Sequence, residues 1–423
     1  MTTHPMTAIA SPRWESLTRA PKAPLAATVA RGIFGRAVGL VPVRVTTPNG
    51  PAFGGAVADP LAPEFEIVRP GAFFARLGAD TKIGFGEGYM AGDWRAGAGT
   101  DLADLLTPFS ARLATLVPRP LQRLRALVDK RIPSTQENSL EGSRGNIQAH
   151  YDLSNDLFAQ FLDPSMSYSS AWFDTDHPGV REDLEAAQLR KIDGVLDYAG
   201  VTEGTRVLEI GTGWGALAIR AAQRGATVTT VTLSSEQLDL AQERVTHAGL
   251  ADGVDLRLQD YREVEGQYDA IVSVEMLEAV GEQYWPTYFS AIDRLLAPGG
   301  KVSIQAITMS HERMLETRRS FSWIQKYIFP GGIIPSLQAI DESLSEHTTL
   351  RVSHRRELGP HYAETLKQWR ARFLENWPHV QALGFDETFR RMWEFYLAYC
   401  EAGFRTGYLG VSQLQLTREP TWT

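Results

Sequence analysis

Short runs of β-branched and other apolar residues alternate with helical patterns in the second half of the chain. The runs are 206–210, 226–231, 269–274 and 301–304, and the helical patterns lie around 181–199 and 235–248. Strands that alternate with helices in this way form a parallel sheet with helices packed on both faces. The pattern therefore predicts an α/β domain built on a Rossmann-like, doubly wound sheet.

The N-terminal part of the chain follows a different pattern. Residues 1–40 contain scattered Pro and Gly and are expected to be weakly ordered. Over 41–134, Pro and Gly turns separate short apolar segments, and 84–94, "GFGEGYMAGDW", is rich in Gly and aromatic residues. This range is predicted to be a smaller α+β accessory domain. The polar stretch 135–146 is the predicted linker, and 147–423 is the predicted larger domain.

An amphipathic helix is predicted at 118–133, "PRPLQRLRALVDKRIP", because its apolar residues fall on one stripe with basic side chains around it. Such a helix packs on its own domain or rests on the surface of an anionic membrane. The sequence leaves both alternatives open.

Composition narrows the classes of function that are open to the chain. The 423 residues are 43% hydrophobic and 22% charged, as in ordinary globular proteins, and the net charge of −8 argues against a general nucleic-acid binder. One Cys excludes an intramolecular disulfide, and the nine His lack metal-ligand spacing. No apolar run reaches the roughly 18 to 20 residues of a spanning helix. We therefore expect a cytoplasmic protein without a metal ion.

A Gly-rich turn follows the first predicted strand of the larger domain, in "VLEIGTGWGALAIRAA" (207–222). Glycine permits a tight turn and close approach of a ligand at the carboxyl edge of a sheet. The spacing of Gly211, Gly213 and Gly215 differs from the Gly-x-Gly-x-x-Gly of dinucleotide sites. The second strand also ends without a carboxylate, so NAD is disfavoured. The residues that stand there are Thr232, Leu233, Ser234 and Gln237.

The acid-x-Gly-x-Gly-x-Gly pattern that begins at Glu209 resembles the first motif of class I S-adenosylmethionine methyltransferases. The resemblance implies S-adenosylmethionine as the cofactor. It also implies that Gln259 and Asp260, in "RLQDYRE" (257–263), lie near the adenine.

Seven stretches, in order along the chain, resemble the cyclopropane-fatty-acyl-phospholipid synthases and the related mycolic-acid cyclopropane synthases. They are "HYDLSNDLFAQFLDPSMSYSSAWF" (150–173), "VLEIGTGWG" (207–215), "VTLSSEQ" (231–237), "SVEMLEAVGEQYWPTYF" (273–289), "FSWIQKYIFPGGIIPS" (321–336), "PHYAETLKQW" (360–369) and "EFYLAYCEAGFRTGYLGVSQ" (394–413). The likeness covers the larger domain and extends weakly into the accessory domain through "GFGEGYMAGDW".

This resemblance implies an enzyme that methylates a cis double bond in an acyl chain of a phospholipid, at the membrane surface. In the family the proton acceptor is commonly a bicarbonate held by a Cys, a Glu, a His, a backbone group at an Ile, and a Tyr. The Glu, Ile and Tyr correspond to Glu278, Ile307 and Tyr362. The Cys and His are replaced by Ser170 and Gln305, which puts bicarbonate in doubt.

Other positions follow from the same resemblance. Tyr151, Tyr168 and Ser169 match residues near the cofactor, and the segment 305–375 is expected to shape an acyl tunnel. Glu275 stands where many members have Gly. It is either a second acid in the site or a structural residue, and the base is either bicarbonate or a protein carboxylate from Glu275 or Glu141.

Two products are open to such an enzyme: a cyclopropane, or, after a hydride shift, an exocyclic methylene. The combination of Ser170, Gln305 and Glu275 looks more like the actinobacterial branch that makes 10-methylene stearoyl chains. A flavin-dependent reductase is then the expected partner, and a homo-oligomer is left open. The alternatives of another class are a methyltransferase for a soluble small molecule and a lipid-binding protein without catalysis.

Overall fold

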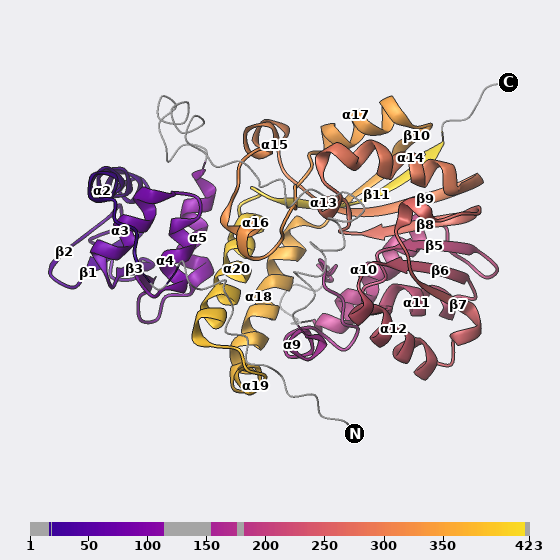
Figure 1. Ribbon diagram of the computed structural model, residues 1–423, viewed down its shortest axis with the longest axis horizontal. Coiled ribbons are helices and arrows are strands. Elements are labelled where there is room, and N and C mark those ends of the chain that lie inside the picture. The colour runs from indigo at the N-terminus through magenta and orange to yellow at the C-terminus, as the bar shows by residue number, and fades with distance from the viewer. Residues whose placement is uncertain (1–16, 18, 114–153, 176–181, 419–423) are drawn as a thin grey trace. The chain divides into compact units, whose positions relative to one another are not determined.

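The computed structural model describes residues 17, 19–113, 154–175 and 182–418. The chain divides into two compact units (Figure 1). The smaller unit contains 1–130, 321–328 and 369–406, and the larger unit contains 131–320, 329–368 and 407–423.

The larger unit is built on a seven-stranded sheet in the order β10-β11-β9-β8-β5-β6-β7. The strands are β5 (Arg206–Ile210), β6 (Thr227–Thr232), β7 (Val254–Leu258), β8 (Tyr268–Val274), β9 (Leu296–Thr308), β10 (Leu350–Glu357) and β11 (Gly410–Arg418). The first five are parallel, and β10 and β11 extend the sheet in antiparallel pairing. The predicted Rossmann-like sheet is confirmed.

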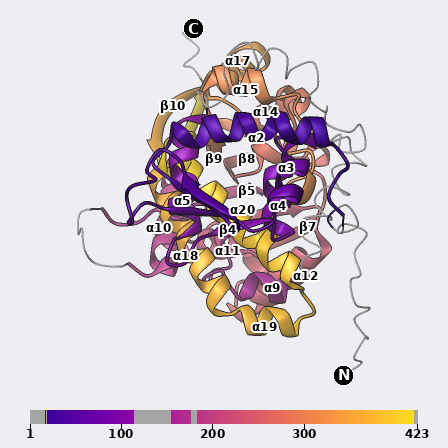
Figure 2. The same cartoon turned by 90° about the vertical axis from the view of Figure 1, so that its left-hand side faces the viewer.

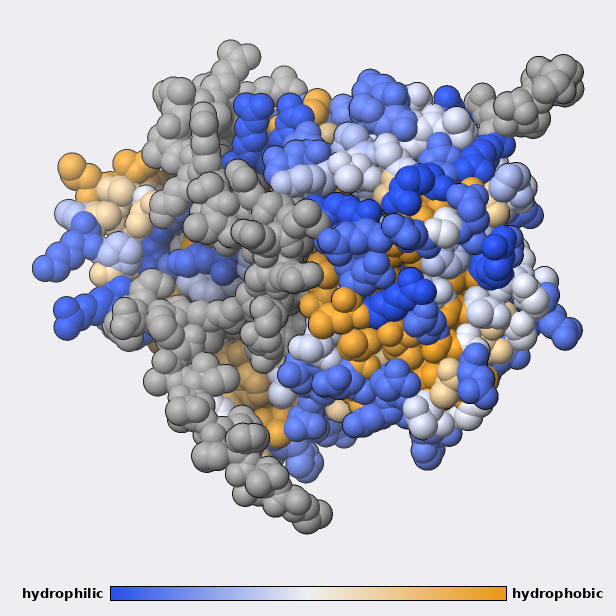
Figure 3. Space-filling view, turned by 45° about the vertical axis from the view of Figure 1, so that its right-hand side comes forward, coloured by the Kyte–Doolittle hydropathy of each residue, from blue (hydrophilic) through white to orange (hydrophobic). Residues whose placement is uncertain are grey.

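Helices cover both faces of this sheet (Figure 1). One apolar cluster joins α10 (Leu184–Ala199), α11 (Ala216–Gln223) and α12 (Ser235–His247) to one face, and another joins α14 (Trp285–Leu295) and α17 (Leu337–His347) to the opposite face. Buried β-branched strands between two such layers are the usual core of a parallel sheet. On the face shown in Figure 3, hydrophilic side chains of the larger unit border an area of apolar residues.

Strand order determines where a ligand can bind. From the central strand β5 the chain continues outward to β6 and β7, and it then returns to the other side of β5 as β8. Ligands of open α/β sheets bind at the carboxyl ends of the strands, where the order reverses in this way. The turns after β5, β8 and β9 therefore meet at the expected site.

The remaining helices of the larger unit connect these elements. They are α9 (Asn155–Ala159), α13 (Leu277–Val280), α15 (His311–Thr317) and the first part of α18 (Gly359–Glu375), with short 3₁₀ turns at Ala251–Gly253, Tyr261–Glu263 and Glu282–Tyr284. No helix in the described part of the chain is long and apolar enough to cross a membrane.

The smaller unit has a four-stranded sheet in the order β2-β1-β3-β4. Its elements are β1 (Arg44–Thr47), β2 (Gly50–Phe53), β3 (Glu64–Ile67), β4 (Trp94–Ala96), α2 (Pro24–Gly39), α3 (Pro70–Ala79), α4 (Gly84–Met90), α5 (Leu102–Ala111), α16 (Trp323–Tyr327), α19 (Trp377–Ala382) and α20 (Glu387–Arg405). Helix α2 lies alongside α3 in both views (Figures 1 and 2). The rings of Phe65 and Trp94 stack at 4.4 Å in its core.

The structure differs from the predicted domains in two places. Residues 24–39 form the regular helix α2, so the expectation of a weakly ordered segment 1–40 is wrong there, because Ala30, Phe34 and Val38 recur at helical spacing and are buried. Residues 321–328 and 369–406 group with the smaller unit. The predicted helix 118–133 and linker 135–146 lie outside the described residues.

Candidate active site

The Gly-rich turn connects β5 to α11 at the carboxyl edge of the sheet. Gly211, Gly213 and Gly215 have φ angles of 98°, 52° and 85°, which favour glycine. A Cβ on Gly211 would lie 2.6 Å from Cγ of Met276, so the turns after β5 and β8 pack closely. Apart from its chain neighbours, no atom of the described residues would lie within 4 Å of a Cβ on Gly213. This open space is where a ligand can approach the backbone.

Glu209 is the penultimate residue of β5, just before the turn. Its Oε2 accepts a hydrogen bond from Oγ1 of Thr230 (2.6 Å), which in turn lies 2.7 Å from Oγ1 of Thr212. Burial raises the pKa of Glu209 to about 8, against the effects of Thr230 and Lys191. The structure therefore places this predicted cofactor residue at the turn as a buried acid.

The residues after β6 form a compact cap. Oγ of Ser234 accepts the backbone N–H of Gln237 (3.2 Å) at the start of α12, and Oγ1 of Thr232 accepts the N–H of Ser234 (3.1 Å). The hydroxyl of Thr232 also lies 3.1 Å from Oε1 of Gln237. Leu233 is half-buried between them. These hydroxyls shape the end of the strand.

Gln259 and Asp260 follow β7, the neighbouring strand. Nε2 of Gln259 donates to the carbonyl of Glu263 (3.0 Å), and Arg262 donates to both carboxylate oxygens of Asp260 (2.8 and 2.7 Å). Each carboxylate oxygen has two acceptor positions, so Asp260 retains some for a ligand. That both residues lie near the adenine remains a prediction.

Tyr168 and Ser169 come from the loop after α9. The ring of Phe158 lies 5.1 Å from that of Tyr168 and 5.0 Å from that of Trp214, which follows Gly213 in the turn. Oγ of Ser169 accepts a hydrogen bond from Nζ of Lys191 (2.6 Å). Tyr151 lies outside the described residues.

Glu275 lies at the centre of a ring of hydrogen-bond donors. Its Oε1 accepts hydrogen bonds from the backbone N–H of Ser170 (2.9 Å) and from Nε2 of Gln305 (2.9 Å). Its Oε2 accepts one from the hydroxyl of Tyr362 (2.8 Å). Three residues predicted for the site, from the loop before α10, from β9 and from α18, thus meet on one carboxylate.

The amide of Gln305 is held in one orientation by more distant residues. Arg356 has only donors, and its Nη1 donates to Oε1 of Gln413 (2.9 Å). Gln413 therefore presents Nε2 to Oε1 of Gln305 (3.1 Å), which leaves Nε2 of Gln305 for Glu275 and for the carbonyl of Ser170 (3.3 Å). Because an arginine cannot accept a hydrogen bond, this series of hydrogen bonds runs in one direction only, and the amide of Gln305 donates to Glu275.

Glu278 lies in α13, three residues beyond Glu275. Its Oε1 accepts the backbone N–H of Ile307, and its carbonyl accepts the N–H of Ile333 (2.9 Å). Within the described part of the chain, its buried Oε2 has no hydrogen-bond partner. Burial, and then the charge of Glu275, raise the pKa of Glu278 to about 8.

Glu275 and Glu278 are both half-buried, and each negative charge disfavours the other. Burial also raises the pKa of Glu275, but its three donors and the ammonium of Lys191 act in the opposite direction. Among the described residues, Glu278 has a single backbone donor from another residue. The surroundings therefore favour the charged form of Glu275 more than that of Glu278.

The backbone of Glu275 is also unusual. Its φ of 53° lies in the left-handed region that favours glycine, and its N–H donates to the carbonyl of Gln305 (2.7 Å). Such a conformation costs roughly 1–3 kcal/mol in other residue types and is concentrated at functional sites. The strain brings a carboxylate to a position where glycine would leave space.

Lys191 belongs to this site although the sequence pattern alone did not single it out. Burial lowers its pKa to about 8, while the charges of Glu275, Asp163 and Glu209 raise it. A signal was present, because helical spacing places Lys191 on the apolar face of α10 with Ala187 and Val195. A charged residue on such a face requires acidic partners.

Bicarbonate does not fit the ring of donors. Of the groups that the family resemblance assigns to it, those at Ser170, Gln305 and Tyr362 donate to Glu275, and the N–H of Ile307 donates to Glu278. A carboxylate of the chain itself therefore occupies the donors that a bound anion would need.

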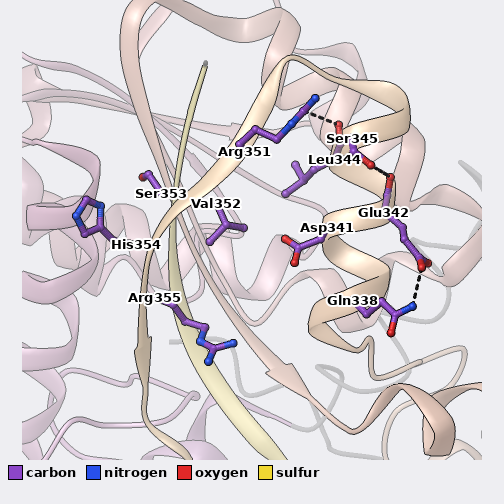
Figure 4. Close-up of a pocket in the computed structure, with 10 residues that line it drawn as sticks. All are labelled: Gln338, Asp341, Glu342, Leu344, Ser345, Arg351, Val352, Ser353, His354 and Arg355. Carbon is purple, nitrogen blue, oxygen red and sulfur yellow. Dashed lines mark hydrogen bonds between the residues drawn. The ribbon is translucent and has the colours of Figure 1, made fainter. Parts of the chain in front are cut away.

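A separate surface hollow lies between α17 and β10 (Figure 4). Several of its polar side chains already bond one another or the backbone. Nε2 of Gln338 donates to Oε1 of Glu342 (2.8 Å), and Oγ of Ser345 donates to the carbonyl of Glu342 (2.9 Å). The hollow lies within the segment 305–375 that is expected to shape an acyl tunnel, but none of its residues is a predicted catalytic or cofactor-binding residue, and we assign it no function.

The fold and the turn together define a class of protein. A seven-stranded sheet of this order, with an acid-x-Gly-x-Gly-x-Gly turn at the switch in strand order, is that of a class I S-adenosylmethionine-dependent methyltransferase. The model of the mycolic acid cyclopropane synthetase family matches residues 138–414, and the chain belongs to this family.

Similar proteins agree with this assignment. The tuberculostearic acid methyltransferase UfaA1 of Mycobacterium tuberculosis is 52% identical over 98% of this chain and 97% of its own length. The cyclopropane-fatty-acyl-phospholipid synthase of Escherichia coli K12 is 36% identical over 82% of this chain and 86% of its own.

A solved structure identifies the cofactor. Mycolic acid cyclopropane synthase CmaA1, complexed with SAH and CTAB, has a TM-score of 0.59 and 34% identity, over 64% of this chain and 97% of that chain. SAH is what S-adenosylmethionine becomes when it has lost its methyl group. S-adenosylmethionine is therefore the cofactor of this chain, and the open Gly-rich turn fits it.

Proposed function

We propose that this protein methylates the cis double bond of an oleoyl-type acyl chain in a phospholipid and converts it to a 10-methylene acyl chain. The observation that carries the proposal is the 52% identity, over almost the whole length of both chains, to a tuberculostearic acid methyltransferase. The two half-buried acids at the carboxyl edge of the sheet, Glu275 and Glu278, supply the chemistry that such a reaction needs.

S-adenosylmethionine supplies an electrophilic methyl group when bound. The π electrons of the alkene form the new carbon–carbon bond to that methyl, and the electron pair of the broken sulfur–carbon bond stays on sulfur. The other alkene carbon becomes a cation. A negative charge in a site without water stabilises such a cation more strongly than water does. The charged carboxylate of Glu275 is suited to this role.

The cation has two fates, which are separated by a hydride shift. If the new methyl loses a proton at once, a cyclopropane closes. If hydride first moves from the methylated carbon to its neighbour, loss of the same proton gives an exocyclic methylene. We favour the second because the site combines Ser170, Gln305 and Glu275. Reduction of the methylene to a methyl branch needs two electrons and two protons, which we assign to a partner flavin-dependent reductase.

The experiment uses vesicles of phospholipid whose oleoyl chains carry deuterium at carbons 9 and 10, with S-adenosylmethionine and the full-length protein. We expect terminal-methylene signals in the proton NMR spectrum of the released chains and both deuterium atoms on carbon 9. High-field ring signals, with one deuterium on carbon 9 and one on carbon 10, would instead assign cyclopropane synthesis. No added carbon, judged against a sample without S-adenosylmethionine, would contradict lipid methylation.

The substrate also requires contact with a membrane surface, and α2 is suited to it. Leu25 and Val29 are 85% and 62% exposed, one turn apart, and Arg36 continues the same stripe. Apolar side chains with basic residues beside them favour the interface of anionic bilayers. We propose that this stripe, Leu25, Val29 and Arg36, rests on the membrane from its cytoplasmic side.

Replacing Leu25 and Val29 with serine together should weaken binding to anionic vesicles by roughly 100-fold, because each fully buried aliphatic side chain contributes about 1.5–3 kcal/mol and each 1.4 kcal/mol is about tenfold in affinity. Flotation of the protein with vesicles measures the effect. Leu61→Ser is the control, since Leu61 is 92% exposed but stands in a loop. Equal losses in both variants would contradict a specific role for α2.

A further inference from the structure

We propose that the carboxylate of Glu275 is the base that removes the proton from the substrate cation, so that this enzyme carries its proton acceptor within its own chain. The inference rests on the proposed function and names the residue that performs its last step.

The hydrogen bonds of Glu275 leave one acceptor position open. A carboxylate offers about four such positions, two on each oxygen. Among the described residues, Oε1 uses both of its positions, for Ser170 and Gln305, whereas Oε2 uses one, for Tyr362. The remaining position on Oε2 is the place where a proton can be received.

The surroundings hold Glu275 in the form that a base requires. The chain from Arg356 through Gln413 turns the amide of Gln305 towards it as a donor, and the buried ammonium of Lys191 adds a favourable charge. Glu278, with an unpartnered Oε2 and its proton, is the weaker candidate. Arg356 and Gln413 therefore act as positioning residues, and Glu275 acts on the substrate.

The step balances without another reactant. A carbon–hydrogen bond of the added methyl group breaks, its proton goes to Oε2 of Glu275, and its electron pair forms the new bond to the cationic carbon. The carboxylate becomes a carboxylic acid, and the substrate becomes neutral. Neither an oxidant nor a bound anion from solution is required.

Three proteins are compared on oleoyl phospholipid vesicles in buffer freed of carbon dioxide. The wild type is expected to turn over at a rate that added bicarbonate does not change. Glu275→Gln should lose about 10³-fold in turnover, within the range that general base catalysis contributes, with its affinity for S-adenosylmethionine within threefold of wild type. Glu346→Gln, whose side chain is 70% exposed in α17, should match the wild type.

Glu275→Gly separates a chemical role from a structural one. Glycine suits the φ of 53° and leaves a space of carboxylate size with its donors intact. This variant should be inactive in plain buffer and should recover turnover when formate is added, whereas Glu275→Gln should not. A merely structural Glu275 would give no such rescue. The proposal would be overturned if formate did not restore turnover in Glu275→Gly, if Glu275→Gln retained turnover, or if the wild-type rate rose with bicarbonate.

An infrared difference spectrum, wild type minus Glu275→Gln at neutral pH, gives a reading without any lipid. A carboxylate band assigned to residue 275 supports the proposal, and a carboxylic acid band overturns it. If the wild type methylates no phospholipid, the proposed function fails, and the spectrum still decides whether Glu275 is a charged base.

Discussion

Replacement of Gly213 with leucine is expected to weaken binding of S-adenosylmethionine by at least about 100-fold, or roughly 2.7 kcal/mol. At a φ of 52° a residue other than glycine costs roughly 1–2 kcal/mol in the folded state. More importantly, the side chain would extend into the open space beside the turn, where no atom of the described residues other than the chain neighbours lies within 4 Å of the Cβ position. Titration calorimetry measures the dissociation constant directly.

The matched control is Gly204→Leu. Gly204 also has a positive φ, 80°, and open space around its Cβ position, but it precedes β5 at the opposite end of that strand. We expect a similar loss of stability and a dissociation constant within twofold of wild type. Normal binding by Gly213→Leu would show that the cofactor does not lie against this turn.

Replacement of Arg370 with methionine is expected to lower the free energy of unfolding by about 3–5 kcal/mol. Arg370 is 7% exposed and bonds two acids within the smaller unit, Glu401 (2.9 Å) and Asp101 (2.8 Å). The side chain of Glu401 is fully buried. Removing the arginine deprives a buried carboxylate of one partner, which costs far more than a lost surface contact. Urea unfolding followed by tryptophan fluorescence gives the difference.

Arg95→Met is the comparison, because Arg95 also makes two hydrogen bonds to a glutamate, Glu66 (2.7 and 2.8 Å), but is 64% exposed. Its loss should cost less than about 1 kcal/mol. Equal effects of the two replacements would mean that burial does not determine the contribution of Arg370.

Sequence patterns predicted the centre of the larger sheet well and its edges poorly. The run 206–210 became β5 without a change of boundary, because strands buried on both faces read as continuous apolar runs. Strand β10 has the sequence "LRVSHRRE", and half of its residues are exposed. An edge strand of this kind resembles a loop in sequence, since apart from Leu350 and Val352, which pack on the core, it is held in the sheet by backbone pairing with β11.

The site could be predicted only in part. Motif resemblance selected Ser170, Gln305 and Tyr362, but it could not show what they would contact, because hydrogen bonds between residues far apart in the chain follow from the fold. The structure shows that all three donate to Glu275, whose role the sequence had left open. The sequence around Gln413 and Arg356 did not mark them as site residues, since a glutamine or arginine that faces the site from a strand cannot be told from an exposed one by sequence.

The left-handed backbone at Glu275 has a consequence at the level of the gene. Glycine fits this φ without strain, and the resemblance to the family places glycine here in many members. The glycine codons GGA and GGG differ from the glutamate codons GAA and GAG by one base. At this position, the change from glycine to the proposed base thus requires only a single point mutation.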